Sequence, residues 1–207
     1  MWNKKDPVKI TIDWYSHTVE SYKAGRSDLS RDEDNRRYFL SNIKWKKILD
    51  IWCAHGRDTV EFYKNGMDVT GIDLTPEFIT MAKENCPNAN IQLMDMRDLK
   101  FDNETFDGIR ACASFLHIPK NEAKKTLQGF YRILKKWWLL FMSVIEGIGE
   151  WYDKKAKYNN EERFFSYRQK EWLEQELKEN GFSIYKIFVN NPSGSGSNWV
   201  NVFAIAE

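Results

Sequence analysis

The sequence predicts an α/β protein built on one doubly wound, mostly parallel sheet of seven strands that ends in an antiparallel hairpin. Three observations lead to this prediction. Short apolar runs alternate with helical patterns between residues 47 and 141, which is typical of βαβ units on a parallel sheet. Two strand-like runs near the end of the chain flank the turn-forming segment NNPSGSGS, which favours a hairpin. The length of 207 residues fits one domain.

The parallel part of the sheet is expected from five strands and the helices between them. The strands are expected at 47–51, 68–73, 90–95, 106–114 and 139–145, and the connecting helices at 57–66, 75–86 and 120–135. Gly66 should end the first helix, and Thr75 should cap the second, with Pro76 at its first position. The third helix carries its apolar residues on one face, as expected of a helix that covers a sheet.

The remaining segments surround this core. Residues 146–167 are polar and too irregular for a plain connection, so they are expected to form a lid loop. An amphipathic helix at 168–181 precedes the hairpin strands 182–189 and 198–206. Residues 1–44 should form one or two helices that act as a lid or cap. The aromatic residues of this segment either line a site or pack against the rest of the protein. We therefore divide the single domain into 1–44, a cofactor-binding core at 45–145, the loop 146–167 and the C-terminal segment 168–207.

Composition narrows the classes of function. Hydrophobic residues make up 42% and charged residues 29%, a balance typical of soluble globular proteins, and the net charge of +1 provides no field that would attract nucleic acid or a membrane. No window approaches the roughly 18 apolar residues of a membrane span, and the N-terminus has no signal-peptide pattern. Three cysteines without C-x-x-C spacing indicate neither a disulfide framework nor a metal site. A cytoplasmic protein with a small-molecule partner is expected, and the oligomeric state stays open.

Candidate ligand-binding residues follow the predicted parallel strands. In an open parallel sheet, ligands bind outside the carboxyl ends of the strands. The turn after the first strand would need residues without side chains, so that backbone N–H groups can approach the ligand. Asp73 ends the second strand about twenty residues beyond that turn, where a carboxylate can accept hydrogen bonds from both hydroxyls of a ribose.

Five segments in this order and spacing carry a family resemblance. They are ILDI…G at 48–56, DVTGIDLTPEFITMAKENCP at 68–87, MDMRDLKF at 94–101, FDGIRACASFLHIPK at 106–120 and LQGFYRILKKWWLLFMSV at 127–144. With them the chain resembles the class I S-adenosylmethionine-dependent methyltransferases, especially the small single-domain type. The resemblance implies a Rossmann-like fold, S-adenosylmethionine as cofactor and methyl transfer to a small molecule.

The resemblance also implies roles for individual residues. Asp73 would bind the ribose, Asp95 would meet the adenine amino group, and Met96 would lie beside the adenine ring. His117 follows the fourth strand, where the acceptor approaches, and it could serve as a base near neutral pH or be a structural histidine. The complete set implied to bind cofactor is Asp50, Gly56, Asp73, Leu74, Asp95 and Met96.

The first turn departs from the family pattern D-x-G-x-G-x-G. This chain reads Asp50-Ile51-Trp52-Cys53-Ala54-His55-Gly56, so Trp52 and Ala54 replace two glycines. A left-handed conformation at Ala54 would cost about 1–2 kcal/mol, and the indole of Trp52 would either occupy cofactor volume or strain the turn. We therefore expect impaired cofactor binding, with Trp52, Ala54 and His55 as the altered residues.

Two further departures lie on later strands. Arg110 stands on the fourth strand where many relatives carry an aromatic residue, and it would need a partner if buried. Trp137 and Trp138 precede the fifth strand where relatives tend to carry two glycines.

Two alternatives stay open. In one, evolution or engineering has remodelled the pocket for another ligand, with Cys53 as nucleophile and His55 as base in esterase-like chemistry. In the other, the chain is a binding-only pseudoenzyme whose pocket is closed by tryptophan.

Overall fold

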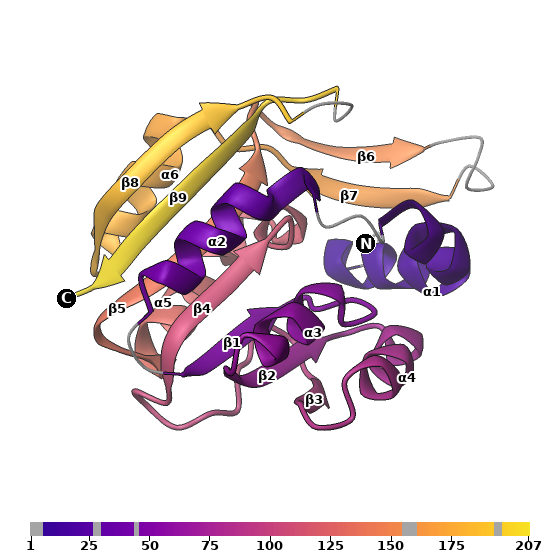
Figure 1. Cartoon of the computed structure of the whole chain (residues 1–207). Coiled ribbons are helices and arrows are strands. Elements are labelled where there is room, and N and C mark those ends of the chain that lie inside the picture. Colours follow the sequence, from indigo (N-terminus) through magenta and orange to yellow (C-terminus); the bar gives the residue numbers. More distant parts are fainter. Residues whose placement is uncertain (1–5, 27–29, 44–45, 155–160, 193–195) are drawn as a thin grey trace.

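The central feature of the protein is a seven-stranded sheet with the order β3-β2-β1-β4-β5-β9-β8 (Figure 1). The computed structural model describes residues 6–26, 30–43, 46–154, 161–192 and 196–207. Strands β1 to β5 pair in parallel, and β9 runs antiparallel between β5 and β8. The predicted mostly parallel sheet with antiparallel C-terminal strands is confirmed. The strands are β1 (Lys47–Ile51), β2 (Asp68–Asp73), β3 (Asn90–Leu93), β4 (Phe106–Cys112), β5 (Leu134–Ile145), β8 (Phe182–Asn190) and β9 (Trp199–Ala206).

The helices lie close to their predicted places. They are α1 (Pro7–Arg26), α2 (Glu33–Ser41), α3 (Arg57–Lys64), α4 (Pro76–Asn85), α5 (Lys120–Ile133) and α6 (Lys170–Glu179). Helix α4 begins at Pro76 with Thr75 in the N-cap position, but the Thr75 hydroxyl makes no cap hydrogen bond. The Thr75 backbone N–H donates to the Asp73 carboxylate at 2.8 Å, which fixes the turn between β2 and α4.

Two predicted segments differ from the structure. Strand β5 begins at Leu134 rather than 139, because Leu134 already pairs with Phe106 before a register shift that contains Trp137. Residues 146–167 contain a second, two-stranded sheet of β6 (Glu150–Lys154) and β7 (Glu162–Ser166), where we predicted a loop. The alternation of apolar and polar residues is too short there to indicate strands on its own.

The N-terminal segment has two separate roles. Helix α1 lies beside the β6–β7 hairpin and α4, where the carboxyl ends of the parallel strands point (Figure 1). Helix α2 instead packs on a face of the sheet, with Phe39 against Phe141. Gly108 on β4 allows this approach, because a Cβ there would lie 2.3 Å from a methyl carbon of Ile43. Helix α1 therefore lies at the strand ends, whereas most of α2 covers a face of the sheet.

Candidate cofactor and acceptor site

The turn after β1 has an unusual backbone conformation. The φ angles of Trp52, Ala54 and Gly56 are 65°, 49° and 82°, all in the left-handed region that favours glycine. These are the three positions that the family pattern fills with glycine. Gly56 is also held by close packing, since a Cβ there would lie 3.1 Å from the Cα of Ala82. The turn thus keeps a glycine-type backbone while two of its positions carry side chains, at a cost of about 1–2 kcal/mol each.

The side of the site that the resemblance assigns to adenosine is closed. The Asp73 residue is only 1% exposed, and its carboxylate accepts hydrogen bonds from the backbone N–H groups of Ala54 (2.9 Å) and Thr75 (2.8 Å). Burial raises the pKa of Asp73 to about 6, although these two hydrogen bonds favour the ionised carboxylate. The space between Trp52, Asp73 and their neighbours has no room for a water molecule. Its walls are Ile51, Trp52, Ile72, Asp73, Leu74, Met94 and Met96.

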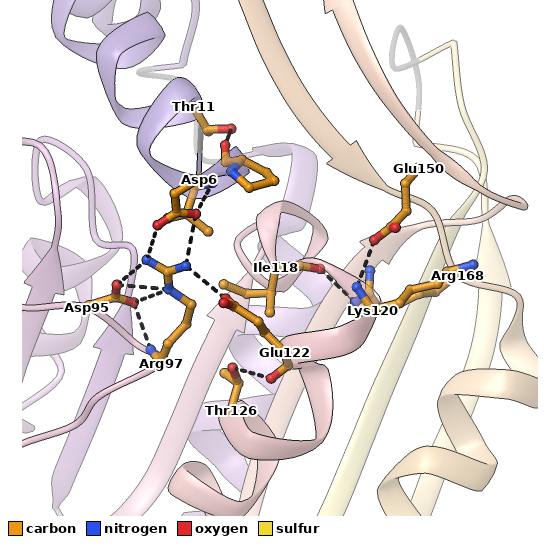
Figure 2. A network of polar contacts seen from close by, with 12 residues as sticks. Asp6, Thr11, Asp95, Arg97, Ile118, Lys120, Glu122, Thr126, Glu150 and Arg168 are labelled. Carbon is orange, nitrogen blue, oxygen red and sulfur yellow. Dashed lines mark hydrogen bonds and ion pairs between the residues drawn. The ribbon is translucent and has the colours of Figure 1, made fainter. Parts of the chain in front are cut away.

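Asp95, which the resemblance places at the adenine amino group, is held by an arginine (Figure 2). Arg97 binds the Asp95 carboxylate at 2.7 Å and also contacts Asp6 of the α1 segment at 2.9 Å and Glu122 of α5 at 2.8 Å. One guanidinium therefore ties the loop after β3 to two helices. Asp95 and Asp73 lie at the predicted strand ends, but both are engaged within the protein.

A cavity of about 280 Å³ lies over the ends of β1, β4 and β5. Side chains from α1 and from the β6–β7 hairpin also line it, among them Tyr15 and Arg163. Of the residues singled out in the sequence, those that line it are Asp50, Trp52, Cys53, Ala54, His55, Arg110 and His117. Gly56, Asp73, Leu74, Asp95 and Met96 do not line it. The structure thus separates the predicted site into an open cavity and a closed adenosine side.

One end of the cavity is a buried cluster of charges. Arg110 is 1% exposed and donates to Asp58 at 2.8 Å and to Asp32, so the buried arginine does have partners. Asp58 also accepts from Arg57 at 2.9 Å and from Arg36 at 3.4 Å. Burial favours the neutral form of Asp58, but the facing cations, with Arg110 contributing most, outweigh it and lower its pKa.

Asp50 lies next to this cluster, and its pKa shifts in the opposite direction from that of Asp58. Burial and the nearby charge of Asp58 raise the pKa of Asp50 to about 6, although Arg110 and a 2.8 Å hydrogen bond from Thr59 favour its ionised form. The cavity therefore has a polar end that offers both carboxylates and guanidinium groups.

His117 lies at the other end as a neutral, fully hydrogen-bonded ring. Its Nδ1 lies 2.7 Å from the carbonyl of Phe164, which can only accept, so Nδ1 carries the proton. Its Nε2 then accepts from the Tyr15 hydroxyl at 3.1 Å. Burial, aided by the charge of Arg163, lowers the pKa of His117 to about 3. This geometry favours a structural role for His117 over that of a base near neutral pH.

Cys53 and His55 do not form a nucleophile–base pair. The Cys53 side chain packs among Ile79, Ala82 and Ile91, and burial raises its pKa well above the ordinary value of a thiol. Within the described part of the chain no hydrogen bond joins Cys53 to His55, whose Nδ1 is buried without a hydrogen-bond partner. The geometry gives no activated thiolate here.

The residues that sequence reasoning missed come from distant segments. Asp58 and Asp32 hold Arg110, and Arg163 lies beside His117, where it meets Tyr15, one of the aromatic residues expected in the cap. Asp58 could have been noticed as an acid at a helix start, but Arg163 lies in the segment predicted to be a loop. Among the described residues, no group of three or more histidines, cysteines or acids is placed to hold a metal ion, and no helix is long and apolar enough to cross a membrane.

Comparison with known proteins places this geometry in context. Residues 48–137 match a family model described as a methyltransferase domain. A putative methyltransferase, YqeM of Bacillus subtilis, is 29% identical over 103 residues, which cover 47% of this chain and 42% of that protein. A ubiquinone biosynthesis O-methyltransferase of Coxiella burnetii is 29% identical over 107 residues, 50% of this chain and 45% of that protein. The match thus spans less than half of either relative.

Solved structures agree over a larger part of the chain. The 1,6-didemethyltoxoflavin-N1-methyltransferase of Burkholderia thailandensis, solved with its acceptor and S-adenosylhomocysteine, has a TM-score of 0.79 at 16% identity and covers 96% of this chain and 88% of its own. The magnesium protoporphyrin IX methyltransferase of Synechocystis, solved with S-adenosylmethionine, has a TM-score of 0.72 at 14% identity and covers both chains completely. At these identities the likeness shows the fold. Residues 48–137 thus match the model of a methyltransferase domain, and the solved structures show that the chain shares the fold of these methyltransferases.

Proposed function

We propose that this chain is an S-adenosylmethionine-dependent methyltransferase for a small acceptor, and that Trp52 impairs its binding of the cofactor. The observation that carries the proposal is the turn after β1. Its backbone has the left-handed conformation at residues 52, 54 and 56, as a glycine-rich cofactor turn would, while Trp52 is one of the residues that line the closed adenosine side. The backbone supports cofactor binding, and one side chain opposes it.

The two halves of the cofactor fit this site unequally. The methionine end carries an ammonium and a carboxylate group, and the polar end of the cavity offers Asp50 for the first and Arg57 for the second. The adenosine end would lie between Asp73 and Met96, where Trp52 leaves no room for a water molecule. The cofactor would supply an activated methyl group. With the indole in this position, its adenosine half does not fit.

The acceptor side supports a small molecule. Helix α1 contributes Tyr15 to the cavity, and strand β7 and the residue after it contribute Phe165 and Tyr167, so an acceptor would be covered from water. Methyl transfer depends mainly on alignment of the acceptor with the methyl group and on exclusion of water. Named relatives that act on ubiquinone precursors or on 1,6-didemethyltoxoflavin agree with an acceptor of this size.

Calorimetric titration with S-adenosylmethionine tests the proposal in three proteins. Trp52→Gly is expected to bind the cofactor tighter than the unaltered chain by about tenfold or more, because it opens the adenosine side. Trp137→Gly is the matched control: it makes the same exchange at a φ of 67°, in a residue that is 71% exposed and does not line the cavity. Equal affinity of all three proteins would contradict the role given to Trp52, and no binding to Trp52→Gly would contradict the proposed activity.

A second candidate is supported by the cavity itself. About 280 Å³ remains open beside the closed adenosine side, so the chain could hold another ligand without the cofactor. This space does not agree with a pseudoenzyme whose pocket is closed entirely. Ligand binding by the unaltered chain in the absence of cofactor, as tested below, distinguishes this candidate.

A further inference from the structure

Arg163 of β7 is a cation in the cavity wall whose hydrogen-bonding capacity is largely unused. Within the described part of the chain its guanidinium makes one hydrogen bond, a 3.4 Å contact from Nη1 to the Tyr15 hydroxyl, and its Nε is buried without an acceptor. No described carboxylate lies within ion-pair distance of Arg163. At the other end of the cavity, by contrast, Arg57 and Arg110 both pair with Asp58.

Aromatic rings fix the orientation of this guanidinium. Its central carbon lies 4.2 Å from the ring centre of Trp14 and 4.4 Å from that of Phe165, distances at which a cation is attracted to an aromatic face. Because the proton of the Tyr15 hydroxyl points to His117, the Tyr15 oxygen can accept from Arg163. The guanidinium is thus held in place before any ligand binds, with N–H groups still available.

We propose that Arg163 determines acceptor specificity by binding an anionic oxygen, a carboxylate or a phenolate, of a flat aromatic molecule. This inference rests on the proposed function, since it takes the cavity as the acceptor site. A half-buried guanidinium without a carboxylate is costly, and a planar fork of N–H donors matches an anionic oxygen group well. Trp52, Phe165 and Tyr167 line the same cavity, so its wall has an aromatic surface suited to a flat molecule.

The lack of a base near neutral pH agrees with an anionic acceptor. His117 is neutral and fully hydrogen-bonded, so it is poorly suited to remove a proton from a neutral hydroxyl. An acceptor that is already ionised needs no such base.

Asp153 lies opposite Arg163 in the register of the hairpin and also lines the cavity, and no ion pair joins these two residues.

Binding measured without cofactor tests this inference separately from methyl transfer. The ligands are 4-hydroxybenzoate, its neutral methyl ester, and 4-nitrophenol, whose bound phenolate is read from its absorbance. The unaltered chain should bind 4-hydroxybenzoate or the phenolate tighter than the neutral ester by about tenfold or more. The anionic ligand that binds more tightly identifies the carboxylate or the phenolate as the recognised group.

Variants then assign the effect to the guanidinium. Arg163→Gln should lose that preference and bind the ester unchanged, Arg163→Lys should retain part of it, and the exposed control Arg37→Gln should keep all of it. Circular dichroism confirms that each variant is folded. Equal binding of the acid, the phenolate and the ester to the unaltered chain, no binding of any ligand, or an equal loss for the preferred anion and the ester in a folded Arg163→Gln would overturn the inference. Failure of Trp52→Gly to bind S-adenosylmethionine would instead affect only the proposed function.

Discussion

Ala54→Gly isolates the strain in the turn after β1 with the smallest change of structure. Ala54 has a φ of 49°, and its backbone N–H donates to Asp73, a hydrogen bond that glycine preserves. Relief of the left-handed conformation should contribute about 1–2 kcal/mol. The greater freedom of glycine in the unfolded chain offsets about 0.4–1 kcal/mol of this. The variant should therefore be more stable by about 0.5–1 kcal/mol, which raises Tm by roughly 1–4 °C.

Urea denaturation followed by circular dichroism measures this change. Ala89→Gly is the matched control, because Ala89 is also half-buried and its φ is not positive. That substitution should lower stability by about 0.5–1 kcal/mol, the ordinary effect of glycine. If Ala54→Gly lowers stability as much as the control does, the turn is not strained and the reasoning is refuted.

Three further predictions concern the buried polar groups. Asp58→Asn should lower the free energy of unfolding by about 3–5 kcal/mol, because buried guanidinium groups lose their shared carboxylate, whereas Asp98→Asn at the surface should change nothing measurable; urea denaturation compares them. His117 titrates at about 3 when folded and near 6.5 when unfolded, so its contribution to stability is lost as the pH falls through this range. Between pH 7 and pH 5 this loss should be on the order of 2 kcal/mol, and a His117→Gln variant with the same pH dependence as the unaltered chain would contradict it. Cys53 should react with thiol reagents and activated esters only in denaturant, and rapid acylation of the folded protein would favour the nucleophile hypothesis instead.

The sheet could be predicted because its signals are local. Apolar runs and helix boundaries recur within a few residues, and Asp73 lies where a parallel strand ends, so the strand positions and the predicted edge followed from spacing. The β6–β7 hairpin could not be predicted in the same way, because only Phe164, Phe165 and Ser166 of its strands are buried and the pattern is too short.

The contacts of the site could not be predicted, because they join segments far apart in the sequence. Arg97 meets Asp6, 91 positions away, and thereby engages Asp95 within the protein (Figure 2). Tyr15 meets His117, 102 positions away, and this contact converts a candidate base into a structural ring. Family patterns indicate where such residues lie along the strands, but not which partner occupies their hydrogen-bonding groups.

The tryptophans show a limit of a different kind. Trp52 and Trp137 both have positive φ, at 65° and 67°, at positions where the resemblance led us to expect glycine. Sequence alone indicated the exchange of residues, but only the backbone shows that the glycine conformation persists beneath each indole. Glycine is the residue that this conformation favours, so natural variants of the chain are expected to carry it at both positions.

The central claim is that a working cofactor site lies beneath the Trp52 indole. A crystal structure of Trp52→Gly with S-adenosylhomocysteine tests it most directly. The account predicts adenosine in the space between Leu74 and Met96, with the ribose hydroxyls on the Asp73 carboxylate. Adenosine bound elsewhere, or bound in this same space in the unaltered chain with equal affinity, would contradict the claim.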